Sequence, residues 1–96
     1  MKIKASVRVM NEARQGTSSA TGTMWRRQEL VLGWSELGDD GRSHEQFLLV
    51  SVMGDDIERL AAQGVTVGCL VEGDVSFRTS TFNNRVHNEV RFSVNS

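Results

Sequence analysis

The chain has 96 residues, of which 39% are hydrophobic and 24% charged, and its formal net charge is -1. This length leaves room for one domain, residues 1–96, and no apolar run approaches the roughly 20 residues that a membrane-spanning helix needs. The single cysteine, Cys69, excludes an internal disulfide and a Cys/His zinc site, so composition predicts a soluble domain in a reducing compartment, without a membrane.

The first predicted element is a strand over residues 2–10. Ile3, Ala5, Val7 and Val9 alternate with polar residues, the period of two that one buried and one wet face produce. This alternation lacks the continuous apolar segment of a secretion signal. We therefore expect a cytoplasmic protein.

The next segments predict a loop followed by a long hairpin. Residues 11–22 are rich in Gly, Ser, Thr and Asn, a composition that favours a mobile loop. Strand chemistry returns over residues 23–36, and Gly-Asp-Asp-Gly at 38–41 is a strong turn signal. The second arm, 45–53, is apolar at nearly every position from Phe47 onward, which predicts a core strand covered on both faces.

A short helix and two more strands complete the predicted order. Acidic residues after Gly54 suit a helix N-terminus and Gly64 suits its end, so the spacing predicts a helix over about 55–63. Period-two patterns then predict strands over 65–77 and 86–94, with a loop over 79–84 between them.

This order predicts an all-β fold with one short helix. A helix between the third and fourth of five strands is typical of the five-stranded Greek-key barrel called the OB-fold. The absence of proline agrees, because a closing barrel must pair its strands on both edges. An open sandwich or another small barrel is the alternative.

Charge is polarised along the chain. Net charge is +5 over residues 1–27, -8 over 28–74 and +2 over 75–96. If the first and last thirds share a surface, that surface attracts phosphate while the rest of the molecule stays acidic. Scattered surface charge is the alternative interpretation.

Five short segments carry a resemblance to a known family. They are Ala-Thr-Gly-Thr-Met at 20–24, Trp-Arg-Arg-Gln-Glu-Leu-Val-Leu at 25–32, Gly54 before the helix, Gly-Val-Thr-Val-Gly at 64–68 and Leu-Val-Glu-Gly at 70–73. In this combination the chain resembles small bacterial and phage single-stranded-DNA-binding proteins with an OB-fold. The acidic turn at 38–41 departs from the family pattern by lengthening the second hairpin.

The resemblance implies a non-catalytic protein that binds single-stranded DNA in replication, recombination or repair. It also implies a nucleoid-associated location and replication or repair proteins as possible partners. Because one small barrel offers a short binding path that self-association would lengthen, we further expect a homo-oligomer (dimer or tetramer). The sequence stops at Ser96 without the long acidic-tipped tail of many family members. Recruitment of partners through such a tail is therefore not expected.

Binding of this kind needs flat side chains for base stacking and cations for phosphates. If Leu30 faces the barrel interior, alternation sends Trp25 and Arg27 outward together, with Arg26 beside them in sequence. Trp25 could instead cap the core. Trp34 falls on the same side of the strand as Leu30, which favours a position in the core. Its place near the hairpin end permits partial exposure.

The last two strands supply further candidates. Phe77 and Phe92 fall in the inward set and are assigned to packing, whereas Arg78 and Arg91 project to the opposite side as candidate phosphate contacts. The connection between these strands holds two more candidates, Phe82 and Arg85. Phe82 either stacks on a base or folds over the barrel mouth, and Arg85 is a candidate phosphate contact.

On the first strand, Lys4 lies on the polar face with Lys2 and Arg8. These cations either extend a phosphate track or keep a strand edge soluble.

Catalytic signals are weak. His44 and His87 fall in separate elements, with no nucleophile or metal-ligand spacing near them, and the glycines lack a phosphate-cradling pattern. We expect no enzyme activity, no metal and no cofactor. The rival interpretations are a protein-interaction barrel and an RNA-binding barrel.

Overall fold

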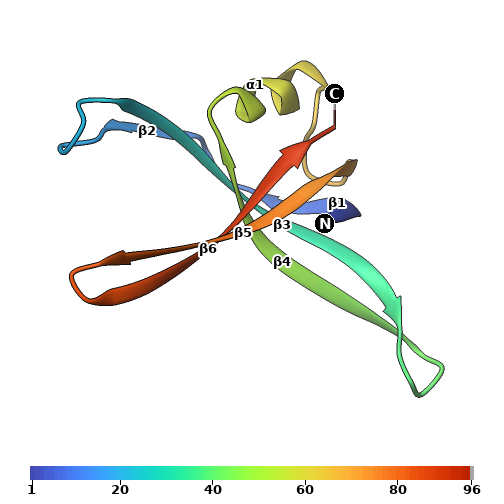
Figure 1. The fold of residues 1–96 in the computed structure, drawn as a ribbon. Helices are drawn as coiled ribbons and strands as arrows, with labels where there is room; N and C mark the ends of the chain where they lie inside the picture. Colours follow the sequence, from blue (N-terminus) through green and yellow to red (C-terminus); the bar gives the residue numbers. More distant parts are fainter. Residues whose placement is uncertain (96) are drawn as a thin grey trace.

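Strands make up most of the computed structural model, which describes residues 1–95; Ser96 and the side chain of Phe82 lie outside the described residues. Figure 1 shows the elements in chain order: β1 (Lys2–Met10), β2 (Arg14–Thr17), β3 (Met24–Leu37), β4 (Ser43–Met53), α1 (Asp55–Ala62), β5 (Leu70–Phe82) and β6 (Arg85–Val94).

Five of these strands close into a barrel. The sheet order is β1-β5-β6-β4-β3, and pairing of β1 with β3 closes the ring. β4 and β6 run parallel, with Ser51 opposite Arg91, and the other pairs are antiparallel. This is the predicted OB-fold barrel with its single short helix.

β1 closes the ring because it pairs on both sides in succession. Its first half, Lys2 to Ser6, pairs with β5, and residues from Ser6 to Met10 pair with β3. A bulge between Val7 and Val9 interrupts the second pairing. Such a bulge bends a strand and increases its twist, which lets one strand serve two walls of the barrel.

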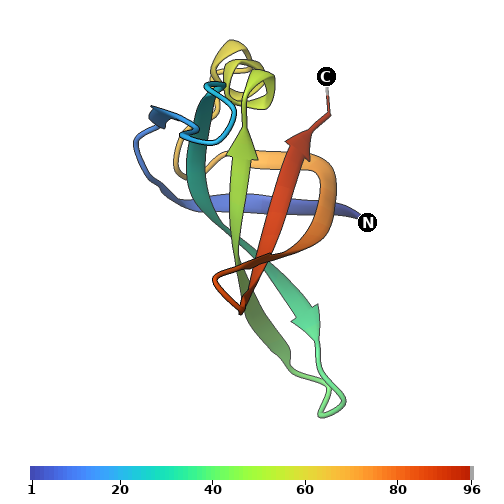
Figure 2. The ribbon, with the colours of Figure 1, turned by 60° about the vertical axis from the view of Figure 1, so that its left-hand side comes forward.

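The barrel interior holds one apolar core. The alternation in β1 and β3 buries Ala5, Val7, Leu30 and Leu32 as predicted, and Phe92 is buried as well. Helix α1 lies at one end of the barrel (Figure 2). Its apolar stripe, formed by Ile57 and Leu60, is buried in the core. At eight residues, this helix is far below the length that crosses a membrane, and no other helix is found among residues 1–95.

Two hairpins project from the barrel on the side away from α1 (Figures 1 and 2), formed by β3–β4 and β5–β6. The predicted loop over 79–84 is wrong. β5 continues to Phe82, β6 starts at Arg85, and Asn83 and Asn84 make the turn with φ of 51° and 62°. Left-handed values at both turn residues fit the twist of a two-residue hairpin, which is why the strands run to the tip.

The prediction that β4 is covered on both faces is wrong. Phe47 is 58% exposed and Leu49 56% exposed, whereas Val50 and Val52 are buried. A closed barrel has one interior, and Phe47 and Leu49 point to its outer face, where the described residues leave them exposed. Val50 and Val52 point inward, and Ser51 between them is buried on the outer face beneath Arg27.

Phe77 is also misassigned, because it is 67% exposed. It has the inward parity of Val75 but lies further along β5, opposite Val90, where the hairpin leaves the barrel. Alternation predicts which side of the strand a residue faces. Burial also requires other side chains packed against that side, and among the described residues the hairpin beyond the barrel lacks them at Phe77.

The predicted loop over residues 11–22 contains a strand. β2, from Arg14 to Thr17, pairs with β3 from Met24 to Arg27. Backbone pairing with β3, and not burial of apolar side chains, holds these polar residues in a strand. Hydrophobic alternation therefore did not predict β2.

Candidate nucleic-acid interface

The outer face of β3 carries an aromatic residue next to a cation. Trp25, Arg27 and Glu29 line a shallow hollow, and residue Trp25 is 41% exposed. The buried positions Leu30 and Leu32 have the opposite parity. The structure thus places Trp25 and Arg27 on one wet face, as the alternation predicted.

The indole of Trp25 lies over Gly16 of β2. Gly16 pairs with Trp25, and a Cβ atom at Gly16 would lie 2.5 Å from Cζ2 of the indole. Arg14 pairs with Arg27, so its side chain shares the face and borders the same hollow. Sequence reasoning missed Arg14 because its segment was assigned to a loop.

Replacement of Gly16 by valine is expected to push the indole outward, because the new side chain needs the space that Trp25 occupies. In a Trp34→Phe background, where Trp25 is the remaining tryptophan, the emission maximum should move to longer wavelength. An unchanged maximum would show that the indole does not rest on Gly16.

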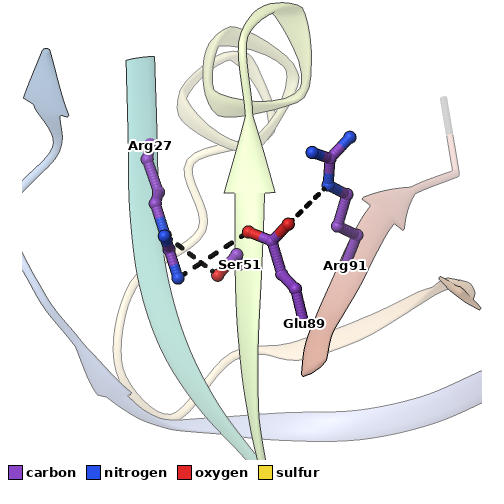
Figure 3. A network of polar contacts seen from close by, with 4 residues as sticks. All are labelled: Arg27, Ser51, Glu89 and Arg91. Carbon is purple, nitrogen blue, oxygen red and sulfur yellow. Dashed lines mark hydrogen bonds and ion pairs between the residues drawn. The ribbon is translucent and has the colours of Figure 1, made fainter. Parts of the chain in front are cut away.

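A polar network ties β3, β4 and β6 together on this face (Figure 3). Arg27 donates from Nε to Oγ of Ser51 at 3.1 Å, and its Nη2 lies 3.7 Å from Oε1 of Glu89. Arg91 donates from Nε to Oε2 of the same Glu89 at 3.1 Å. Two guanidinium groups from different strands therefore converge on one carboxylate.

Ser51 is the polar centre of this network. Its residue is only 4% exposed, and it stands opposite Glu29 on β3 and opposite Arg91 on β6. The bond from Arg27 satisfies its hydroxyl, which removes the penalty of a buried polar group without a partner. Arg27 is thereby fixed against the sheet.

The β5–β6 hairpin extends the basic face. Arg78 pairs with Glu89, which places both side chains on the same side of the ribbon. Arg85 has the parity of Glu89 and lies beside the turn, opposite the backbone of Phe82. The stacking prediction for Phe82 lies outside the described residues, because its side chain is not among them.

Apolar side chains lie on the outer face of β4. Phe47 and Leu49 share the parity of Ser51, and the guanidinium carbon of Arg8 lies 5.9 Å from the centroid of the Phe47 ring. Arg8 also pairs with Glu45 at 3.3 Å. Alternation along a strand could have predicted this arrangement, because it sends Phe47 and Leu49 to the side opposite Val50 and Val52. The sequence prediction instead assigned the whole apolar run to the core.

Three predicted site residues lie away from this face. Lys4 is on the wall formed by β1 and β5, where it pairs with Glu72 at 3.5 Å. Arg26 has the opposite parity to Trp25 and pairs with Glu58 of α1. Trp34 is half-buried against the core, and its Nε1 donates to Oε1 of Glu36 at 2.8 Å.

Among residues 1–95, two ionisable groups have lowered pKa values, and both lie off the candidate interface. At the β3–β4 turn, hydrogen bonds from the Arg42 amide and the His44 ring lower the pKa of Asp40. Before β5, hydrogen bonds from the amide and hydroxyl of Thr66 lower the pKa of the Cys69 thiol.

Within the described part of the chain, no group of His, Cys, Asp or Glu side chains is arranged to hold a metal ion. His44 lies on β4 and His87 on β6, and the interface itself offers cations, hydroxyls and flat apolar groups. These groups can bind an anionic, base-bearing polymer.

The closed barrel with one helix defines the chain as an OB-fold protein. No family model and no curated protein sequence matches it. Solved structures do match over nearly the whole chain. The small single-stranded DNA-binding protein from Streptomyces coelicolor is 15% identical with a TM-score of 0.51, over 100% of this chain and 90% of that one.

Two further structures show the same likeness. The Plasmodium falciparum SSB complex with ssDNA is 11% identical with a TM-score of 0.53, over 97% of this chain and 82% of that one. A deletion mutant of the single-stranded DNA binding protein from Thermus aquaticus is 16% identical with a TM-score of 0.52, over 97% of this chain but 45% of that one. At these identities the comparisons establish the shared fold.

Proposed function

We propose that this protein binds single-stranded DNA, without catalysis, on the outer face of β3, β4 and β6. The observation that carries the proposal is the convergence of Arg27 and Arg91 on a face that also exposes Trp25. The fold shared with single-stranded-DNA-binding proteins supports it.

Each kind of group on the face has a role in such binding. Arg27 and Arg91 present planar guanidinium groups, which bind phosphate oxygens through paired hydrogen bonds. Trp25 and Phe47 offer exposed rings on which any base can stack, for about 1 to 3 kcal/mol each. Stacking tolerates all bases, so we expect little sequence preference.

The path of the strand follows from the order of these groups. It starts at the β2–β3 hairpin near Trp25, crosses β4 at Ser51, and continues along the β5–β6 hairpin past Arg78 and Arg85. Clusters of acidic residues lie on α1 and at the β3–β4 turn, away from this path. On the face itself Glu12, Glu29 and Glu89 lie among the cations, so phosphate attraction is focused at the arginines.

Tryptophan fluorescence tests the proposal. With Trp34 replaced by phenylalanine, an oligonucleotide of thymidines should quench the remaining emission from Trp25. The matched variant, Trp25→Phe, leaves the half-buried Trp34 and should show little quenching. Quenching confined to Trp34, or absent from both variants, would contradict the proposed site.

Replacement of Trp25 by alanine is expected to weaken binding about tenfold, the loss of one base-stacking contact. Folding should be retained, because the indole is partly exposed outside the core. Anisotropy titration gives the affinity, and a thermal melt checks the fold. Loss of the folded state would instead assign the indole a structural role.

We further propose that the chain acts in replication, recombination or repair as a nucleoid-associated homo-oligomer, a dimer or tetramer. One small barrel offers a short binding path, and joining copies raises affinity through effective concentration. Light scattering with and without oligonucleotide measures the assembly. A strict monomer in both conditions would oppose this part of the proposal.

The exposed pair Phe47 and Leu49 also suits a second candidate function, docking of another protein. Salt separates the two, because phosphate binding weakens steeply between low and moderate salt whereas apolar docking changes little. A uridine oligonucleotide in the same titration measures the preference for DNA over RNA.

A further inference from the structure

Glu89 is an acid at the centre of the arginine face. Its two carboxylate oxygens are divided between two guanidinium groups, with Oε1 3.7 Å from Arg27 Nη2 and Oε2 3.1 Å from Arg91 Nε. Arg78 is its partner in register across the β5–β6 pair. Figure 3 shows the carboxylate between Arg27 and Arg91. The side chain of Glu89 is 23% exposed.

A carboxylate in this position resembles the ligand that the face would bind. Guanidinium groups recognise carboxylate and phosphate with the same planar hydrogen-bonding geometry. Glu89 lies against Nη2 of Arg27 and Nε of Arg91, so a phosphate that binds these two donors together would occupy the place of the carboxylate. At these donors the two anions compete.

We propose that Glu89 is an internal competitor of the DNA backbone, which a phosphate group displaces when the strand binds. This inference rests on the proposed function. The carboxylate lowers affinity for single strands and for small anions, so that a ligand must also offer bases for stacking to bind well. Glu89 thereby sets the selectivity of the face.

The contacts of Arg27 distinguish a competitor from a residue that only positions the arginines. Arg27 donates Nε to the buried hydroxyl of Ser51 at 3.1 Å, a bond that is independent of Glu89. The contact of Arg27 with Glu89 is longer, at 3.7 Å. Arg27 therefore keeps its anchor on the sheet when the carboxylate moves away.

The test is Glu89→Gln, with Glu72→Gln as the matched control. Both variants remove one negative charge, but Glu72 pairs with Lys4 on the opposite wall of the barrel. Anisotropy titrations with a thymidine oligonucleotide should show tighter binding of Glu89→Gln by about fivefold at low salt, the scale of one or two partly exposed ion pairs. Glu72→Gln should differ from the wild type by less than about twofold.

Salt dependence gives a second readout. In the wild type, the displaced Glu89 carboxylate takes up one salt cation as the strand binds, so fewer cations are released overall. Glu89→Gln should therefore steepen the slope of log association constant against log salt concentration by about 0.7, the value for one phosphate of a single strand. Unchanged or weaker binding by Glu89→Gln would overturn the inference, and weaker binding would make Glu89 a positioning residue.

Two outcomes keep this inference separate from the proposed function. If neither the wild type nor Glu89→Gln binds the oligonucleotide, the proposed function fails. If the wild type binds and only the predicted gain is missing, the role of Glu89 fails alone. If a thermal melt shows that Glu89→Gln is not folded, Glu89→Thr replaces it, because threonine is favoured in strands. The same gain in affinity is expected for Glu89→Thr.

Discussion

Replacement of both Arg27 and Arg91 by glutamine is expected to weaken binding of a thymidine oligonucleotide by about 100-fold at low salt, because two charge-assisted contacts of about 1.5 kcal/mol each are lost. The remaining carboxylate of Glu89 then faces the DNA backbone without its two partners. The slope of log K against log salt should also become shallower, since fewer phosphates are neutralised.

A charge-matched double variant controls for net charge. Arg42 lies at the β3–β4 turn and Arg59 pairs with Asp56 on α1, both away from the interface. Arg42→Gln with Arg59→Gln should bind within about threefold of the wild type, because exposed charges at a distance are largely screened. Equal losses in the two double variants would mean that general charge, and not this face, governs binding.

Gly73→Ala is expected to lower the free energy of unfolding by about 3 kcal/mol, the upper range for an overpacked core. Gly73 is buried in β5 between Ile3 of β1 and Val94 of β6. A Cβ atom there would collide with the backbone carbonyl oxygen of Ser93 and approach the ring of Phe92. Neither neighbour is the flexible end of a side chain, so the barrel wall itself must shift.

Urea denaturation measures this loss, with Ser76→Ala on the exposed side of the same strand as the control. The control should change the free energy of unfolding by less than about 0.5 kcal/mol. A similarly small change for Gly73→Ala would show that the two strands can separate there at little expense. The close approach of strands also gives a physical reason for glycine at the end of the Leu-Val-Glu-Gly segment.

The barrel itself could be predicted because its core residues follow a period of two. Ala5 and Val7, and then Leu30 and Leu32, alternate with polar positions and are buried as the pattern indicates. The acidic start and apolar stripe of α1 predicted its place, and the helix ends one residue before the expected limit. These patterns are set by residues close together in the sequence, so they can be read from the sequence alone.

The errors arose where burial depends on what lies opposite a strand. Phe47 and Leu49 are as apolar as their buried neighbours Val50 and Val52, but among the described residues no element packs over their side of β4. Phe77 keeps the inward parity yet lies on a hairpin that has left the barrel. Hydrophobicity alone does not encode where a barrel wall ends.

The candidate site could be predicted in part. Alternation placed Trp25 and Arg27 on one face, and it placed Arg91 outward on the last strand. It could not show that β4 and β6 run side by side, which brings Arg91 to Ser51 and Glu89 to Arg27. Arg26 was included as a neighbour in sequence, although adjacent residues of a strand face opposite sides.

NMR amide shifts, followed during titration with a thymidine oligonucleotide, locate the bound strand on the barrel. We expect the largest changes on the outer face of β3, β4 and β6, at the Trp25 indole, Arg27, Ser51 and Arg91, with the β1–β5 wall around Lys4 unaffected. Changes centred on that opposite wall, or an unperturbed spectrum at low salt and excess oligonucleotide, would contradict this placement of the strand.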